Sequence, residues 1–179
     1  IVNLEPSVAP WPKDIDFLLV GHGSQAAWKH VQSDLYSRVQ WLKEIIAGGV
    51  SGLAVGSGQE IFYMPNDFNP MGLGLIYREL EVRERESRFL IADLDGVDVL
   101  GYLNRSTDAP TIERLGSMVL TGLHGPVLAK NETLLDSILL EISRRSDIEV
   151  GVATSAQSQA RVSKAVSQVW QLEEPLARE

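Results

Sequence analysis

The sequence predicts an α/β fold in which a mostly parallel sheet lies between helices as the middle layer of a three-layer sandwich. Three short apolar segments, each followed by a loop that contains glycine, indicate buried strands at 16–20, 51–55 and 118–123. Helical patterns follow the first two strands, and this alternation is typical of parallel sheets with right-handed crossovers. The 179 residues, 44% of them hydrophobic, suit a single domain over 1–179.

The N-terminal half alternates strands with helices. Residues 1–4 predict a short strand before a connector that contains proline, and apolar spacings of three and four predict one helix over 25–47. A glycine pair ends that helix. After the second apolar strand, another helix is expected to begin at Ser57 and to stop at Pro65.

The rest of the chain departs from this alternation. Residues 72–104, approximately, predict an antiparallel excursion of two longer strands joined by a tight Asp95-Gly96 turn. Asn131 is expected to cap the helix after the third apolar strand, and an amphipathic helix is expected over 155–172. The inward-facing residues are predicted to be Leu135, Ile138 and Ile142 in the first of these helices, and Val162, Val166 and Val169 in the second.

The composition argues against several kinds of function. The net charge of −8 and the pI of about 4.9 disfavour binding to nucleic acid or to an anionic membrane. No apolar run is long enough to span a bilayer and no secretion signal is visible, so a cytoplasmic protein is expected. The chain has no cysteine, which excludes a thiol nucleophile, and its three histidines at unrelated spacings predict neither a metal site nor a cofactor.

Three loops that follow apolar strands are the candidate site. They read "GHGSQ" (21–25), "GSGQE" (56–60) and "LHGP" (123–126). In a parallel sheet, the loops at the carboxyl ends of the strands meet at one edge, where ligands bind. Each loop by itself is more often a simple turn, so the prediction of a common cleft depends on the set and its order.

These segments also match the motifs of a known family in the same order. The family's nucleophile strand corresponds to "LAVGSGQEIFY" (53–63), and its Gly-Leu-Gly-Ile-Leu and Gly-Phe-Glu-Asn-His-Gly segments correspond to "GLGLI" (72–76) and "GYLNRS" (101–106). The strongest match is "TGLHGPVLAKN" (121–131). The chain thus resembles class I (triad-type) glutamine amidotransferases of the cobyric-acid-synthase-like branch, most of all the glutaminase subunit of lipid II isoglutaminyl synthase.

The resemblance implies a chemistry, a partner and a set of site residues. In that family a cysteine attacks the side-chain amide of glutamine, and the ammonia passes to a Mur-ligase-like synthetase subunit. By position, Gly56 stands where the nucleophile is expected and His124 where the general base is expected. The resemblance assigns oxyanion or substrate-binding positions to Gly21, His22, Gly23, Ser57, Arg88 and Asn104.

The departures from the family suggest that hydrolysis has been lost. Gly56 has no reactive side chain, and Ser57 follows one position too late to replace it. His22, Leu103 and Arg105 stand where the family has Gly, Glu and His. A residue with a side chain at the turn apex would have a strained backbone conformation that costs about 1–3 kcal/mol, and glycine avoids this cost. The leading hypothesis is therefore a subunit without glutaminase activity.

Two other hypotheses stay open. In the first, the chain belongs to an active glutaminase lineage and has lost its cysteine by engineering or incidentally. In the second, it is a module that uses the emptied cleft to bind a small molecule or a protein. Glutamine or a related small molecule is the ligand that the resemblance suggests for the cleft.

Overall fold

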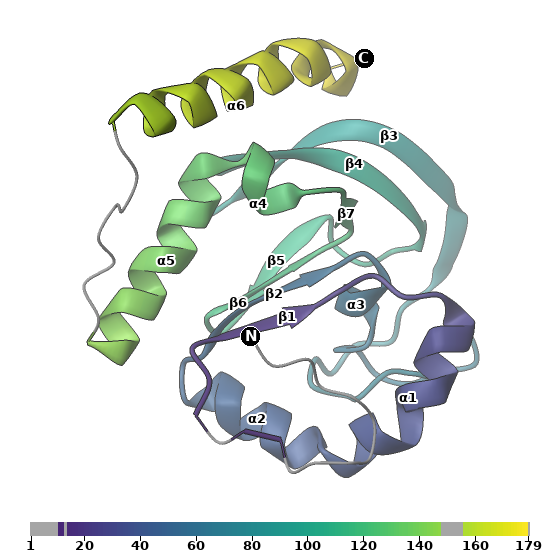
Figure 1. Ribbon diagram of the computed structural model, residues 1–179. Helices are drawn as coiled ribbons and strands as arrows, with labels where there is room; N and C mark the ends of the chain where they lie inside the picture. Colours follow the sequence, from purple (N-terminus) through teal and green to yellow (C-terminus); the bar gives the residue numbers. More distant parts are fainter. Residues whose placement is uncertain (1–10, 13, 148–155, 179) are drawn as a thin grey trace.

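Two sheets with helices around them make up the fold (Figure 1). The computed structural model describes residues 11, 12, 14–147 and 156–178, so the strand predicted at 1–4 lies outside the described residues. The elements are β1 (Phe17–Val20), α1 (Gln25–Ser37), α2 (Val39–Ala47), β2 (Ser51–Val55), α3 (Ser57–Glu60), β3 (Val82–Leu94), β4 (Val97–Thr107), β5 (Ile112–Leu115), β6 (Met118–Thr121), β7 (Leu123–His124), α4 (Val127–Lys130), α5 (Glu132–Ser146) and α6 (Ala156–Ala177).

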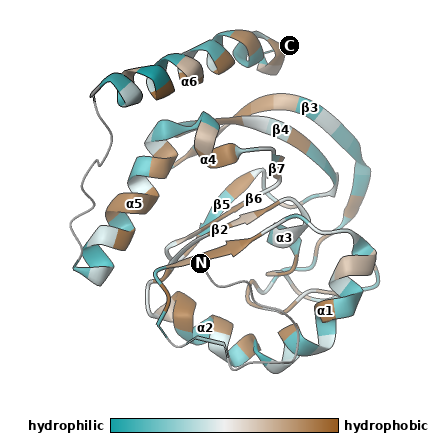
Figure 2. Cartoon of the chain, in the orientation of Figure 1, coloured by the Kyte–Doolittle hydropathy of each residue, from teal (hydrophilic) through white to brown (hydrophobic). Residues whose placement is uncertain are grey.

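The mostly parallel sheet has the order β1-β2-β6-β5, and its first three strands are parallel as predicted. Successive residues of a strand face opposite sides of the sheet. Ala54 and Leu120 therefore pack on the side of α1 and α2, whereas Leu53 and Val119 pack on the side of α5 and the second sheet. Both faces are covered, which accounts for the mainly hydrophobic colouring of these strands (Figure 2).

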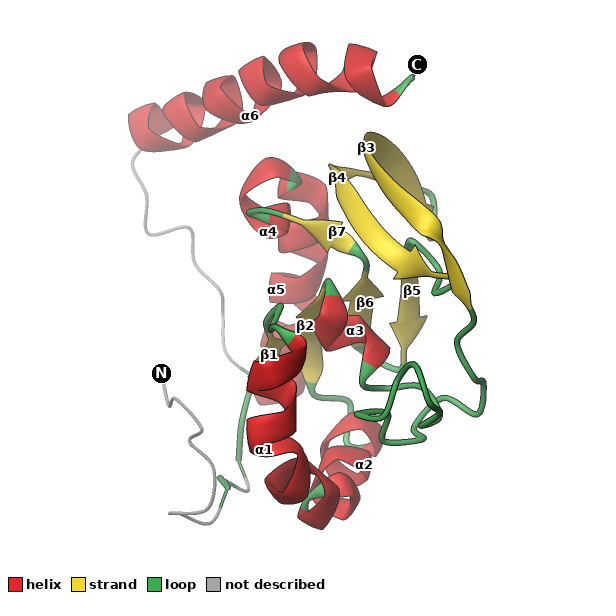
Figure 3. Ribbon diagram, turned by 90° about the vertical axis from the view of Figure 1, so that its right-hand side faces the viewer, coloured by secondary structure: helices red, strands yellow, loops and turns green. Residues whose placement is uncertain are grey.

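The antiparallel sheet has the order β3-β4-β7 and lies above the carboxyl edge of the parallel strands (Figure 3). The predicted turn between β3 and β4 is confirmed, because Asp95 (φ 57°) and Gly96 (φ 82°) both adopt the positive φ of a type I′ hairpin turn. The short strand β7 pairs with β4, opposite Tyr102 and Leu103. This pairing brings His124 next to the hairpin.

The excursion begins later than predicted, and the helix after β2 is shorter. β3 starts at Val82 rather than near residue 72, and α3 ends at Glu60 rather than at Pro65. Both errors have one cause. The carbonyls of residues 61–63 accept hydrogen bonds from the amides of residues 73, 74 and 76, so neither segment is free to extend a helix or a strand.

The predicted helix over 25–47 consists of two helices. Arg38 separates α1 from α2 with a non-helical ψ of 7°, and its amide donates to the carbonyls of Leu35 and Tyr36. The apolar stripe still faces the sheet, since Leu42 and Ile45 are buried in α2. The hydrophobic period thus predicted the face correctly but did not reveal the break.

Asn131 directly precedes α5, but the prediction that its side chain caps the helix is wrong. Its Oδ1 accepts from the Leu100 amide (2.8 Å), and its Nδ2 donates to the carbonyls of Leu100 (2.9 Å) and Val127 (2.8 Å). This buried amide therefore joins α4 to β4. On the inward face of α5, Ile138 is buried as predicted, whereas the neighbouring buried residue is Leu134 rather than Leu135.

The C-terminal helix α6 covers residues 156–177 and lies along β3, on the side of the hairpin away from α1 and α2 (Figures 1 and 3). Trp170 Nε1 donates to the Lys130 carbonyl (2.8 Å), and Lys130 Nζ pairs with Glu173 (2.6 Å). Val162 is 53% exposed, so its predicted inward orientation is wrong, whereas Val166 and Val169 are half-buried. Among the residues that the structure describes, no helix combines the length and apolarity that crossing a bilayer requires.

The buried Asn131 amide generates the first prediction. Asn131→Ala leaves buried backbone groups of Leu100 and Val127 without a partner, and each such group costs about 1–3 kcal/mol. We expect chemical denaturation to show a loss of at least about 2 kcal/mol in the free energy of unfolding. Ser137→Ala, which removes one partly buried bond within α5, is the control and should cost less. Equal losses in the two variants would contradict this reading of Asn131.

Candidate functional site

The turn between β2 and α3 has the geometry of a nucleophile elbow with glycine at its apex. Gly56 adopts φ 56° and ψ −129°, a conformation that side-chain-bearing residues enter only under strain. Its amide donates to the Thr121 carbonyl of β6 (2.8 Å), which fixes the apex at the carboxyl edge of the sheet. A Cβ at this position would lie 2.7 Å from His22 Nδ1 and 2.9 Å from His124 Cε1. The backbone conformation and the space available therefore both favour glycine at this position.

Ser57 ties the elbow to the loop after β1. Its Oγ accepts hydrogen bonds from the Gly23 amide (3.0 Å) and from Trp28 Nε1 (2.9 Å). The hydroxyl has one proton to give, and the Gly23 carbonyl (2.7 Å) is a nearer acceptor than His22 Nδ1 (3.2 Å). The Ser57 amide donates to the same His22 nitrogen (3.2 Å). The hydroxyl thus holds the loop in place, and the amide expected to serve as an oxyanion donor already has an acceptor.

His22 and His124 face each other across the apex, with ring centroids 4.7 Å apart. His124 Nε2 lies 3.1 Å from the carbonyl oxygen of Asn104, and since a carbonyl can only accept, this nitrogen carries the ring proton. Burial lowers the pKa of His124, and the neighbouring His22 lowers it further, outweighing the opposite effects of the Asn104 hydrogen bond and of Glu60. His124 is therefore neutral at neutral pH, with its proton on the nitrogen nearer to the apex.

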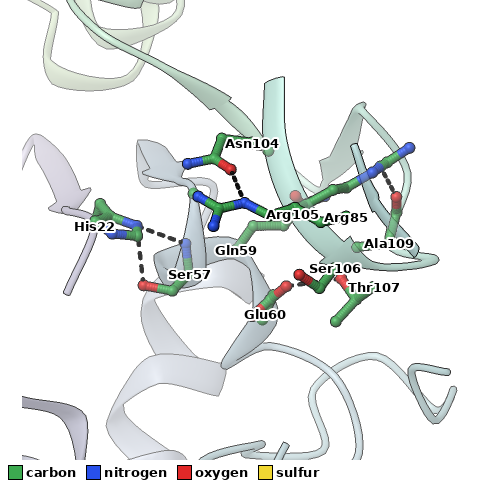
Figure 4. Close-up of a pocket in the computed structure, with 12 residues that line it drawn as sticks. His22, Ser57, Gln59, Glu60, Arg85, Asn104, Arg105, Ser106, Thr107 and Ala109 are labelled. Carbon is green, nitrogen blue, oxygen red and sulfur yellow. Dashed lines mark hydrogen bonds between the residues drawn. The ribbon is translucent and has the colours of Figure 1, made fainter. Parts of the chain in front are cut away.

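A polar pocket of about 340 Å³ opens beside the elbow, between α3 and the β3–β4 hairpin (Figure 4). Arg85 Nε donates to Asn104 Oδ1 (2.9 Å), and its guanidinium lies on the elbow side of the pocket (Figure 4). The guanidinium of Arg105 extends the other way, to the Ala109 carbonyl. Glu60 accepts a hydrogen bond from Thr107 Oγ1 (2.7 Å). Two cations, one carboxylate and several neutral polar groups thus line a single opening.

The structure brings most of the predicted site residues to this place. His22, Gly56, Ser57 and Asn104 line the pocket, and His124 borders it through its contact with Asn104. The remaining glycines of the first loop have different positions: Gly23 bonds to Ser57, and the Gly21 carbonyl lies against α3.

Arg88, expected to hold substrate, does not line the pocket. It is exposed on β3 and pairs with Glu86 (2.7 Å). Arg85, three residues earlier, is the arginine of β3 that lines the pocket, and no motif in the sequence pointed to it. Gln59 and Glu60, within the candidate loop 56–60, line the pocket as well. The segment "RERESR" contains three arginines at close spacing, and only the pairing of β3 with β4 decides which of them reaches the elbow.

Comparisons of the chain with models of known protein families and with curated proteins find no match. Within the described ranges, no group of three or more His, Asp or Glu side chains is arranged to hold a metal ion. The elbow and the pocket are therefore the features from which a function can be inferred.

The lowered pKa of His124 predicts a pH dependence of stability. The unfolded chain binds a proton at this histidine more readily than the folded chain does, so stability is fully present above the unfolded pKa and falls as the pH drops below it. We expect the free energy of unfolding to decrease as the pH is lowered from about 7.5 to about 5.5, a range that spans the ordinary histidine pKa. His124→Gln should reduce this decrease, whereas His30→Gln, on the exposed side of α1, should leave it unchanged. An unchanged pH dependence in His124→Gln would contradict the assignment.

Proposed function

We propose that this chain is a glutamine amidotransferase-like subunit that has lost glutamine hydrolysis and that works in the cytoplasm beside a Mur-ligase-like synthetase of the lipid II isoglutaminyl synthase type. One observation carries the proposal. Gly56 holds the strained apex conformation between a parallel strand and a helix, and the His124 ring lies about where a base would face a nucleophile at that apex. The order of the sequence motifs along the chain supports the same assignment.

Three features of the elbow argue against hydrolysis. The chain has no cysteine, and the Ser57 hydroxyl is held by the loop after β1. The Ser57 amide, which would stabilise an oxyanion, donates to His22. The His124 nitrogen nearer to the apex carries a proton, so it has no lone pair with which to act as a base there. Replacing one residue would not restore all three functions.

A second candidate function is a binding module that uses the emptied cleft. The polar pocket beside the elbow favours it, because its volume and charged lining suit a small polar molecule. The two functions are distinguished by the partner: recovery of a Mur-ligase-like synthetase with the tagged chain, identified by mass spectrometry, supports the subunit, and its absence favours the binding module.

The loss of hydrolysis is tested directly by measuring ammonia release from glutamine. We expect the purified chain to release no more ammonia than the uncatalysed background, since it lacks a nucleophile with a base to activate it. His124→Ala should give the same background rate. Release well above background in the unsubstituted chain that His124→Ala abolishes would overturn the proposal.

The crowding at the apex gives a sharper test. Gly56→Cys places a Cβ against both histidine rings and in a positive-φ conformation, so we expect it to lower stability by about 1–3 kcal/mol. Adding His22→Gly removes one of the two rings and frees the Ser57 amide, so the double variant should unfold at a higher temperature than Gly56→Cys alone. His22→Gly by itself is the matched control.

We expect both cysteine variants to react with an electrophilic glutamine analogue more readily than they turn over glutamine. The double variant recovers an oxyanion donor, and such a donor is worth roughly a hundredfold to a thousandfold in rate. In both variants the neutral His124 ring still carries its proton on the nitrogen nearer to the apex, so it cannot act as a base there and turnover should stay low. Rapid, sustained ammonia release by Gly56→Cys alone would instead support an active lineage that has lost only its cysteine.

A further inference from the structure

We propose that a second, apolar pocket, between α1 and the strand β1, binds a small uncharged ring compound that brings one hydrogen-bond acceptor to Trp11 Nε1. The apolar pocket shares no described lining residue with the polar pocket beside the elbow. The inference therefore goes beyond the proposed function and does not depend on it.

The apolar pocket has a volume of about 230 Å³. Two tryptophans, Trp11 and Trp28, line it together with aliphatic side chains from β1, α1 and α2. β1 is the last strand at its side of the parallel sheet, and Leu19, which also lines the pocket, is 62% exposed. Apolar surface thus remains in contact with water at this place, and a ligand ring that covers it would be stabilised by its burial.

Trp11 carries a buried donor without an acceptor. Its Nε1 has no hydrogen-bond partner among the residues that the structure describes. The chain has four tryptophans, and the other three indole nitrogens each donate to an oxygen between 2.8 and 3.0 Å away; they belong to Trp28, Trp41 and Trp170. Because a buried N–H without a partner is costly, an acceptor on a ligand in the same pocket would be favoured.

The Trp11 ring is held by its neighbours. It packs edge to face with Trp41, with the ring centroids 4.6 Å apart, and the Arg38 guanidinium carbon lies 4.8 Å from its centroid. The donor therefore has a defined position before a ligand arrives, and less side-chain freedom is lost on binding.

The charges around the apolar pocket favour an uncharged ligand. Asp34 is the one charged side chain among the described lining residues, and its carboxylate is paired with Arg38 (2.9 Å). An ion entering this pocket would lose its hydration without gaining a charge of opposite sign that is still unpaired in the lining.

The volume sets the size of the ligand. A cavity of about 150 Å³ lined by apolar side chains is large enough for benzene. The 230 Å³ of this pocket therefore suits one six-membered ring with a substituent of a few atoms. A carbonyl oxygen on that substituent would supply the acceptor for Trp11.

The test is a calorimetric titration of the full 179-residue chain with three probes. Acetophenone has a ring and a carbonyl acceptor, α-methylstyrene has the same shape with CH₂ in place of the oxygen, and benzoate has the ring with a negative charge. We expect acetophenone to bind at a single site and benzoate to bind more weakly than acetophenone.

Trp11→Phe keeps an aromatic ring but removes the N–H. It should weaken acetophenone binding about three- to tenfold more than it weakens α-methylstyrene binding, because one hydrogen bond is lost for the ketone alone. The effect of the smaller ring is common to both probes. Trp170→Phe on α6, outside the pocket lining, is the matched control and should change neither affinity more than about twofold. Similar melting temperatures show that the variants fold.

The four indole N–H signals provide an independent readout by NMR. Acetophenone, but not α-methylstyrene, should move the Trp11 indole proton downfield, because only the ketone brings an acceptor. Either probe should shift the signal of Trp28, which lines the pocket and donates to Ser57 Oγ. The Trp170 signal should stay unchanged.

The proposal is overturned if acetophenone does not bind, if Trp11→Phe weakens both uncharged probes equally, if benzoate binds more tightly than acetophenone, or if the Trp11 signal does not move. These outcomes leave the proposed loss of hydrolysis standing, since ammonia release tests that loss separately.

Discussion

The close approach of α3 to the end of β1 is the contact on which the site depends. A Cβ at Gly58 would lie 2.7 Å from the carbonyl oxygens of Val20 and Gly21, so only glycine allows the helix to sit there. Ser57 then bonds to both backbone groups of Gly23, and Gln59, buried in the same turn, donates to the Pro110 carbonyl (2.9 Å). One helical turn thereby joins the first loop, the elbow and the segment before β5, and the elbow side of the polar pocket depends on that junction.

The second element of the site depends on the hairpin. β7 pairs with β4, which places His124 opposite Tyr102 and brings Asn104 within hydrogen-bond distance of the imidazole. The Asn131 amide joins β4 to α4 from the buried side. The parallel sheet therefore carries the apex, while the antiparallel sheet carries His124 and the arginines. The pocket exists only where the two sheets meet.

The elbow and the pocket have opposite characters. At the elbow, the amide and the hydroxyl of Ser57 are already used in hydrogen bonds within the protein, and two imidazole rings crowd the place of a Cβ at residue 56. In the polar pocket, the guanidinium of Arg85 bonds to another described residue only through Nε, which donates to Asn104 Oδ1. The proposed loss of hydrolysis rests on this difference, and glycine is the residue that adopts the apex conformation of the elbow with little strain.

The sequence by itself determined the α/β class, the three parallel strands, the Asp95-Gly96 hairpin turn and the arrival of the loops at one edge, because these follow from local periodicity and turn chemistry. Only the tertiary structure decided that α3 stops at Glu60, that Asn131 bonds to β4 rather than capping α5, and that Arg85 rather than Arg88 lines the pocket. Each of these depends on a partner distant in the chain. Hydrogen bonds between distant segments leave no periodic signal, so the pattern of residues along the chain could not reveal them.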